Sequence, residues 1–166
     1  MKLSTQEEYG LRCLMQVAQR ASETGGSISI PEISRAEGLS TAHVGKLVRL
    51  LRLGALVERV RGQAGGYKLA RAASDTRPSD VILISDVLGA LGDPFFNEGF
   101  CDEHTGYEEC CTHSVDCSIR SLWNAIQFVV DQMLDRITLQ DLMGDGHQLE
   151  NHLAHKADEL LQVTMP

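Results

Sequence analysis

The sequence has no apolar run near the length of about eighteen residues that a membrane-spanning helix requires. Its first eight residues, Met1 to Glu8, also lack the apolar core of a secretory signal peptide. We therefore expect a cytoplasmic protein that does not enter a membrane. Because thiols stay reduced in the cytosol, the five cysteines are expected to bind metal or sense oxidation rather than form structural disulfides.

Motifs typical of enzymes and nucleotide-binding proteins are missing as well. The glycine-rich stretch Arg61–Gly66 has no strand-loop-helix context and no Gly-Lys-Ser/Thr after it, which argues against a phosphate-binding loop. The thiols are not accompanied by a base and an orienting residue in a nucleophilic pattern. We therefore expect neither catalysis nor a small-molecule substrate.

Basic residues are scarce overall, since the formal net charge is -8, but they are concentrated at one end. Residues 1–73 carry eleven Lys or Arg against six Asp or Glu, a net charge of +5. Residues 74–166 carry four against seventeen, a net charge of -13. A basic front half and an acidic rear half indicate that only the front half contacts a polyanion.

The chain does have a segment rich in metal ligands, Cys101–Cys117, with four of the five cysteines, two histidines and several carboxylates. It has neither the period of a helix nor the alternation of a strand, so it is expected to be a loop whose thiolates suit an iron-sulfur cluster or zinc. Eight residues separate Cys101 from Cys110 and five separate Cys111 from Cys117, which matches neither paired C-x-x-C knuckles nor a ferredoxin run. The fifth, Cys13, is expected to be a small core residue.

The front half has the pattern of a helix-turn-helix. Ser4-Thr5-Gln6-Glu7 is a capping box that starts a helix, and Pro31 suits the first position of a second one. Ser40 as N-cap and Gly54 as terminating glycine bound a third helix, which this motif presents to the major groove. The first helix is expected to end near Arg20. The second is expected to open at Ile30 and to be closed by Gly38, and the third is expected to run over Thr41–Leu53.

Two short alternating runs, Ala55–Val60 and Tyr67–Ala70, flank the glycine-rich turn and predict a β-hairpin, which after a helix-turn-helix is a wing. Arg61 at its tip is the candidate for a narrow minor groove, and Lys68 adds to the basic charge of the wing. Basic residues on the third helix lie away from its apolar stripe, where they can reach phosphates and base edges. The expected DNA contacts are Ser40, Thr41, His43, Lys46, Arg49, Arg59 and Arg61.

The rear half is expected to begin with a linker over residues 72–79 and a helix capped by Ser79 or Asp80 that ends near Leu91. Beyond the cysteine segment, apolar residues recur at three- and four-residue spacing and predict a long helix, whose apolar seam suits pairing with a second copy of the chain. Thr138 begins another short helix, and the acidic tail, with three histidines, is expected to be a loosely attached helix. The seam residues are Ile119, Leu122, Trp123, Ile126, Val129, Val130, Met133, Leu134 and Ile137.

The sequence therefore predicts a mostly α-helical fold with a small β-wing, in three parts. Residues 1–73 are the expected winged helix-turn-helix domain. Residues 74–143 hold a linker helix, the cysteine loop and a dimerisation helix, and residues 144–166 form the tail.

Several motifs resemble the iron-sulfur transcriptional regulators that include IscR and NsrR, winged-helix regulators of the Rrf-two type. The similarity extends to about Met143 and is carried by M-K-L-S-T and E-E-Y-G-L-R-C-L in the first helix, V-R-G-Q-A-G-G-Y-K-L in the wing, C-S-I-R-S-L-W after the loop, and I-T-L-Q-D-L-M. The resemblance implies a homodimeric repressor or activator that binds double-stranded operator DNA. It also implies a 4Fe-4S or 2Fe-2S cluster held between the two subunits, through which nitric oxide, redox state or iron status is sensed.

By the same resemblance, Cys101, Cys111 and Cys117 match the three cluster cysteines, and Glu8 falls where NsrR-like members place a carboxylate from the partner subunit. Two departures are visible: the first interval is longer than usual, and IscR-like members have a histidine ligand where this chain has Arg120. The alternative ligands are Cys110, His104 and His113. The alternative function is a regulator of the same fold whose cysteines sense thiol oxidation or bind zinc.

Overall fold

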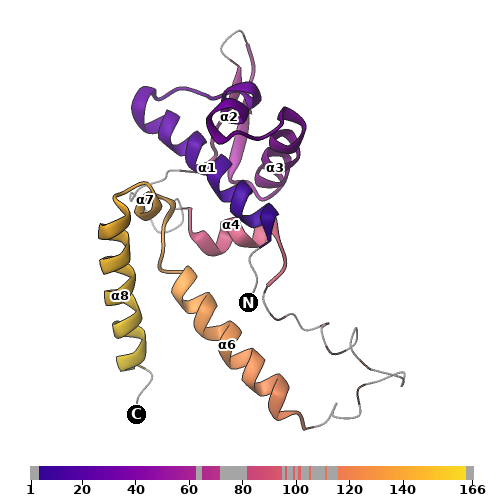
Figure 1. The fold of residues 1–166 in the computed structure, drawn as a ribbon, viewed down its shortest axis with the longest axis vertical. Coiled ribbons are helices and arrows are strands. Elements are labelled where there is room, and N and C mark those ends of the chain that lie inside the picture. Colours follow the sequence, from indigo (N-terminus) through magenta and orange to yellow (C-terminus); the bar gives the residue numbers. More distant parts are fainter. Residues whose placement is uncertain are drawn as a thin grey trace.

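A computed structural model describes residues 4–62, 65–71, 82–94, 96, 99, 101, 105, 111 and 116–163. Most of this chain is helical, and the described strands form one antiparallel hairpin (Figure 1), so the predicted fold class is confirmed. The elements in order are α1 (Thr5–Thr24), α2 (Ile30–Glu37), α3 (Thr41–Leu53), β1 (Val57–Val60), β2 (Gly66–Leu69), α4 (Ile84–Leu91), α6 (Ser118–Leu134), α7 (Leu139–Leu142) and α8 (Gly146–Val163).

The first three helices begin where their capping residues predict. Ser4 and Glu7 form the expected capping box of α1, which runs one turn past the predicted end and stops at Gly25 in the left-handed region, with φ 66°. Pro31 lies in the first turn of α2. The Ser40 side chain accepts a hydrogen bond from the His43 backbone N–H at 3.2 Å, so α3 has the predicted bounds.

The wing is the hairpin of β1 and β2, in which Val57 pairs with Leu69 and Val60 pairs with Gly66. An isolated bridge from Ile28 to Tyr67 attaches the connection between α1 and α2 to the outer side of β2. A Cβ atom at Gly66 would lie 2.5 Å from the Ile28 carbonyl oxygen, so only glycine permits this approach. The wing is therefore fixed to the helix-turn-helix by backbone hydrogen bonds.

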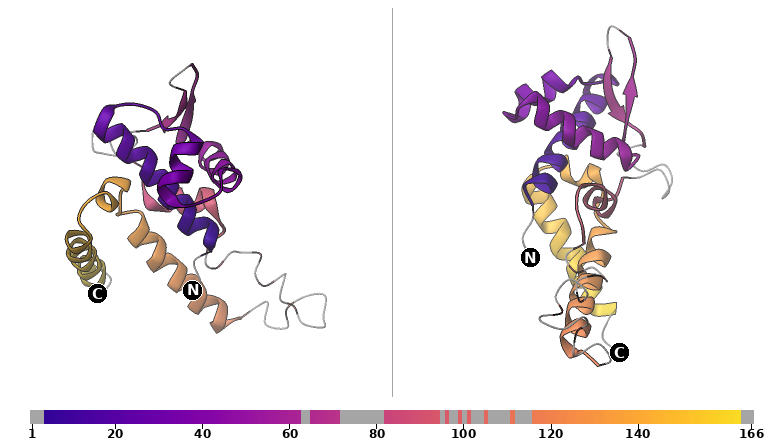
Figure 2. Two further views of the ribbon diagram at one scale, coloured as in Figure 1. Left: turned by 45° about the horizontal axis from the view of Figure 1, so that its top comes forward. Right: turned by 90° about the vertical axis from the view of Figure 1, so that its right-hand side faces the viewer.

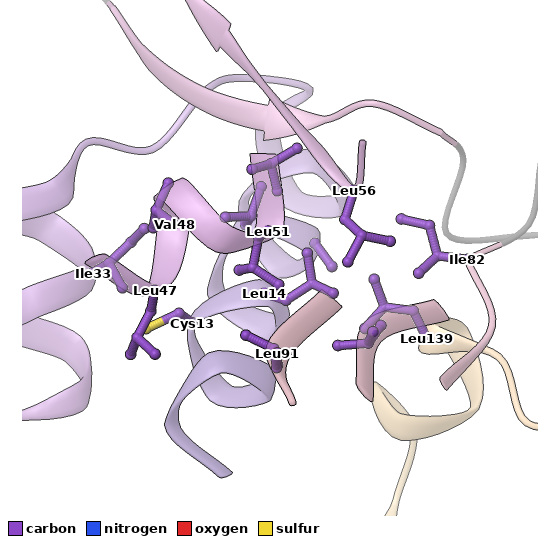
Figure 3. Packing of buried hydrophobic residues seen from close by; sticks show 14 of the residues in the cluster. Cys13, Leu14, Ile33, Leu47, Val48, Leu51, Leu56, Ile82, Leu91 and Leu139 are labelled. Atoms are coloured by element: carbon purple, nitrogen blue, oxygen red, sulfur yellow. The ribbon is translucent and has the colours of Figure 1, made fainter. Parts of the chain in front are cut away.

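One apolar core joins these elements to parts of the chain far along the sequence. In Figure 3, Leu47, Val48 and Ile33 lie at one end of the cluster, while Ile82 and Leu139 lie near Leu56 at the other. Fully buried side chains come from α1, α2, α3, β1, α4 and α7. Therefore α4 and the segment that starts α7 cover one side of the apolar core of the winged helix-turn-helix.

The predicted start of the fourth helix is wrong. Leu83 is extended and forms a bridge with Thr138, so α4 begins at Ile84 and not at the predicted caps, which lie with the linker outside the described residues. The Ile84 N–H donates to the Ile137 carbonyl at 2.9 Å, and the Leu139 N–H donates to the Ile82 carbonyl at 2.9 Å. A strand-like pairing with a distant segment therefore takes the place of the expected first turn.

The long helix α6 extends away from the winged helix, as Figures 1 and 2 show from three directions. The predicted helix is confirmed, but the predicted seam extends past it, because the helix ends at Leu134. Ile137 lies beyond that end and is buried in the core at 7% exposure. Met133 and Leu134 pack partly against the core as well, and the more exposed seam residues Ile119, Leu122 and Val129 all lie before them.

Two further helices complete the chain. Thr138 caps α7 through its side chain, and Asp141 completes a capping box, as expected for the short helix at this position. The tail is helical too: Leu153 of α8 packs partly against the core, and Lys156 donates a hydrogen bond to the Arg136 carbonyl and lies 4.0 Å from Asp141. None of the helices described here is both long and apolar enough to cross a lipid bilayer.

Candidate nucleic-acid interface and cysteine loop

The recognition helix α3 presents its basic side chains to solvent because its apolar stripe is committed to the core. Val44, Leu47 and Leu51 are buried against α1 and α2. At 100° per residue, Lys46 and Arg49 fall on the opposite side, and both are exposed. Ser40, Thr41 and His43, the other predicted DNA contacts on this helix, are exposed at its N-terminal end.

The wing carries less free positive charge than its sequence indicates. Lys68 lies opposite Glu58 in the hairpin, and its Nζ atom is 2.9 Å from the Glu58 carboxylate, so this lysine is paired. Arg59 and Arg61 are exposed and have no ion-pair partner among the described residues. The charge that the wing can offer to a phosphate backbone is therefore that of the two arginines.

Aromatic and charged contacts connect the start of α1 to the start of α3. The Tyr9 and His43 rings meet edge to face, with centroids 5.7 Å apart, and the Arg12 guanidinium lies 5.5 Å from the centre of the Tyr9 ring. Arg12 in turn donates to the Glu37 carboxylate at 2.7 Å, and this hydrogen bond raises the pKa of Arg12, with a smaller contribution from the charge of Glu8. His43 therefore has an exposed ring that is held from the side by α1.

Arg120, in the first turn of α6, interacts with the predicted cluster cysteines. Cys117 is the N-cap of that helix, and its sulfur accepts a hydrogen bond from the Arg120 backbone N–H at 3.4 Å. The pKa of Arg120 is raised, chiefly by a side-chain hydrogen bond with Cys101, and the charges of Cys117 and Cys111 make smaller contributions. All three cysteines are half-buried and unpaired.

The donor set consists of soft thiols, which suit iron in a sulfide cluster or zinc. No three His, Cys, Asp or Glu side chains within the described ranges lie close enough together to hold a single metal ion. The alternative ligands Cys110, His104 and His113 lie outside the described residues, and Glu8 is exposed on α1.

Cys13 takes no part in this arrangement. Its side chain is completely buried in the core, as predicted, and burial raises the pKa of its thiol to about 11. A thiol that is neutral and inaccessible at physiological pH is a poor metal ligand and a poor nucleophile.

Sequence reasoning missed three features of the site: the ring contact of Tyr9 with His43, the ion pair of Glu37 with Arg12, and the interaction of Arg120 with the cysteines. The first two join different helices, so no spacing within one helix could have indicated them. In the sequence, Arg120 stood out only because IscR-like members have a histidine ligand at that position. Its position three residues after Cys117, in the first turn of the predicted helix, was the available signal.

The chain is similar to a known protein family, to individual relatives and to solved structures. Residues 3–145 match the family described as Rrf2, iron-dependent transcriptional regulator. The protein rrf2 of Nitratidesulfovibrio vulgaris is 32% identical over 146 residues, which cover 88% of this chain and 89% of the relative. Among solved structures, T. potens IscR has a TM-score of 0.62 at 30% identity and covers 86% of each chain. CymR, described as the global cysteine regulator of B. subtilis, has a TM-score of 0.62 at 29% identity and covers 86% of this chain and 96% of its own.

Proposed function

The chain belongs to the Rrf2 family of transcriptional regulators, and on this premise we propose that it is a homodimeric DNA-binding regulator controlled by an iron-sulfur cluster. The observation that carries the proposal is that the predicted cluster cysteines Cys101, Cys111 and Cys117 interact with Arg120 at the start of α6, in a chain with a basic recognition helix. The proposal has three parts, which concern the DNA, the second subunit and the cluster.

The DNA part assigns α3 to the major groove and the wing to the adjacent minor groove. Lys46 and Arg49 are exposed on the outer side of α3, and Arg59 and Arg61 are the unpaired charges among the described residues of the wing. Such side chains contact phosphates and base edges, and their charge makes binding sensitive to salt. Ser40, Thr41 and His43 lie at the end of α3 that enters the groove in this motif.

The dimer part assigns the outer face of α6 to a second copy of the chain. Ile119, Leu122 and Val129 are 62%, 54% and 57% exposed, and no residue of α6 is buried within its own chain. A continuous apolar face of this kind is normally covered by a partner surface. Two copies related by a two-fold axis would also present two recognition helices to a palindromic operator.

The cluster part assigns three thiolates from one subunit, Cys101, Cys111 and Cys117, and the Glu8 carboxylate from the other. Thiolates hold iron firmly, whereas a carboxylate is a weaker ligand for a soft site and leaves one corner open to oxidants, nitric oxide or iron loss. Glu8 is one residue before Tyr9, which contacts His43 on the recognition helix. A change at Glu8 is therefore one residue away from a contact with the DNA-reading helix.

The proposal is tested by purifying the chain without oxygen and measuring its visible absorption, iron and acid-labile sulfide. We expect a coloured protein that loses its colour when Cys101, Cys111 or Cys117 is replaced by Ser. Cys110→Ser is the matched control and should keep the colour, and Glu8→Ala should assemble the cluster poorly or change its reactivity. If Cys110→Ser bleaches the protein and Cys111→Ser does not, the ligand assignment is displaced by one residue. An unchanged spectrum and reactivity in Glu8→Ala would place the fourth ligand in the loop.

A second candidate is a regulator of the same family whose thiols are oxidised directly. Two observations favour it: a cationic side chain lies against Cys101, and CymR, described as a cysteine regulator, has a similar structure. Cations beside a thiol promote the reactive thiolate. A colourless chain without iron, whose DNA affinity changes after peroxide treatment and returns with a reductant, would establish this candidate instead.

A further inference from the structure

The imidazole ring of His43 is in contact with a side chain from another helix. His43 is exposed at the third position of α3, and its backbone N–H donates to the Ser40 side chain at 3.2 Å. This hydrogen bond fixes the backbone, but it leaves the ring several rotamers. The Tyr9 ring of α1 meets the imidazole edge to face, with centroids 5.7 Å apart and planes inclined at 78°. The orientation of the imidazole is therefore set by α1 as well as by α3.

Tyr9 is itself held in place by the side chains around it. It packs partly against the core, and the Arg12 guanidinium lies 5.5 Å from the centre of its ring. Arg12 Nε donates to the Glu37 carboxylate at 2.7 Å, and Gln16 donates to the other oxygen of that carboxylate at 2.7 Å. The Glu37 side chain is only 9% exposed and ends α2, just before the turn into α3. The support of the His43 ring is therefore a network that joins α1 to both helices of the helix-turn-helix.

We propose that Tyr9 is a positioning residue for operator reading, which holds the His43 ring in the orientation that contacts a base edge and does not contact a base itself. The inference rests on the proposed function in assigning α3 to the major groove. It deepens that function, because the sequence preference then depends on a side chain outside α2 and α3.

The chemistry of the two rings suits this role. The ring nitrogens of an imidazole can donate to or accept from base edges, such as the N7 and O6 acceptors of guanine. These hydrogen bonds are directional, so a ring that is already oriented avoids an ordering cost on binding. The usual strength of an aromatic pair corresponds to about a two- to tenfold change in affinity. Attraction between lysine or arginine and phosphates depends little on the angle of one ring, so the effect belongs to sequence preference.

The first experiment selects binding sequences from a pool of duplexes with a randomised central region, using the full-length chain purified without oxygen. Tyr9→Leu and His43→Ala should relax the base preference at the same position, and Tyr9→Phe, which keeps the ring, should retain it. The inference is overturned if Tyr9→Leu keeps the preference that His43→Ala loses, or if His43→Ala loses none. A parent chain that enriches no sequence would refute the DNA part of the proposed function, and the inference with it.

The second experiment measures affinity for the selected duplex and for a scrambled duplex of the same composition. Tyr9→Leu should bind the selected duplex about two- to tenfold more weakly and the scrambled duplex as the parent does. In the His43→Ala background, Tyr9→Leu should have little further effect, because the contact is already lost. Lys46, exposed three residues further along α3, is the matched control, and the losses from Lys46→Ala and Tyr9→Leu should add. Equal losses on both duplexes would indicate a displaced α3 and would overturn the inference, as would additive losses from Tyr9→Leu and His43→Ala.

The ring contact itself is measured by NMR on the DNA-free chain. The ring current of Tyr9 should move the His43 ring-proton resonances away from those of an exposed histidine such as His147. Tyr9→Phe should keep this displacement, and Tyr9→Leu should abolish it. His43 resonances that are the same in the parent and in Tyr9→Leu would show that the rings do not meet, which would contradict the inference.

Discussion

The winged helix and the α6 arm use their apolar residues in opposite ways. In the winged helix, every helix and the first strand of the wing contribute side chains to one buried core. In α6, an apolar seam of similar quality buries no residue at all within its own chain. The first region is therefore stabilised by its own packing, whereas the apolar seam of the second is left largely uncovered by the single chain, which is why we propose a second copy as its partner.

The comparison teaches that periodicity alone does not say what a helix packs against. The stripe of α3 and the seam of α6 have the same spacing in the sequence, yet the stripe is buried, whereas Ile119, Leu122 and Val129 of the seam are more than half exposed. The difference arises because α3 is enclosed by α1, α2 and α4, whereas α6 meets the core at its C-terminal end and extends away from it toward its N-terminus.

The largest expected effect is the difference in stability between two Leu→Ala substitutions, one in the core of the winged helix and one on α6. Leu51→Ala should lower the free energy of unfolding by about 2–5 kcal/mol, because it leaves a cavity at a completely buried site. Leu122→Ala on α6 should change it by no more than about 0.5 kcal/mol in a dilute, monomeric chain. Urea titrations of both variants measure the contrast, and equal losses would show that α6 is packed within its own chain.

The proposed pairing of α6 with a second copy is tested by placing a charge in the seam. Ile126→Asp would bury an unpaired carboxylate in the proposed interface, at a cost of several kcal/mol by order of magnitude, and should make the chain monomeric. Asn124→Asp adds the same charge to an exposed position on another face of α6 and should stay dimeric. Light scattering distinguishes the two, and a dimeric Ile126→Asp chain would refute the seam.

A smaller effect is expected when a DNA contact is removed from the winged helix without touching its core. Lys46→Ala should weaken operator binding and reduce the slope of affinity against salt by about one unit if the lysine contacts one phosphate. The urea midpoint should not move, because the side chain is exposed. Affinity measured at several salt concentrations tests this, and an unchanged slope would place Lys46 away from the DNA backbone.

The smallest effect concerns acid stability of the winged helix. Hydrogen bonds from the Ser29 hydroxyl and backbone N–H, with a contribution from Arg20, lower the pKa of Glu32 from 4.5 to about 2. Because the folded pKa lies below the unfolded one, this stabilisation is complete above about pH 4.5 and is lost as the pH falls toward about 2. Thermal unfolding measured at several pH values tests this. Glu32→Gln should reduce the dependence of the thermal midpoint on pH over that range, whereas Glu23→Gln, at an exposed position on α1, should leave it unchanged.

Local signals allowed much of the fold to be predicted from the sequence. The caps at Ser4 and Ser40 act within one turn, so the starts of α1 and α3 and the full extent of α3 were predicted correctly. Contacts between distant segments could not be predicted in this way. The pairing of Leu83 with Thr138 moved the start of α4, and burial of Ile137 in the core removed it from the seam.

The candidate site shows the same division. Residue types and family motifs indicated the cysteines and the exposed bases of α3, because those depend on composition and helical phase. The pairing of Lys68 with Glu58 and the contact between Tyr9 and His43 depend on which elements lie side by side. The proposed roles of Glu8 and the cysteines remain predictions, because they require a cluster and a second subunit.

The attachment of α6 gives the molecule a mechanical property. Its 17 residues make an arm of about 25 Å at 1.5 Å per residue, fixed at one end where Ile137 and Leu139 enter the core, with Cys117 at the other. A turn of about 10° at the fixed end carries the Cys117 end through about 4 Å of travel along an arm of that length. Conversely, a displacement of several ångströms at the Cys117 end of the arm would reach the winged helix as a rotation of only a few degrees.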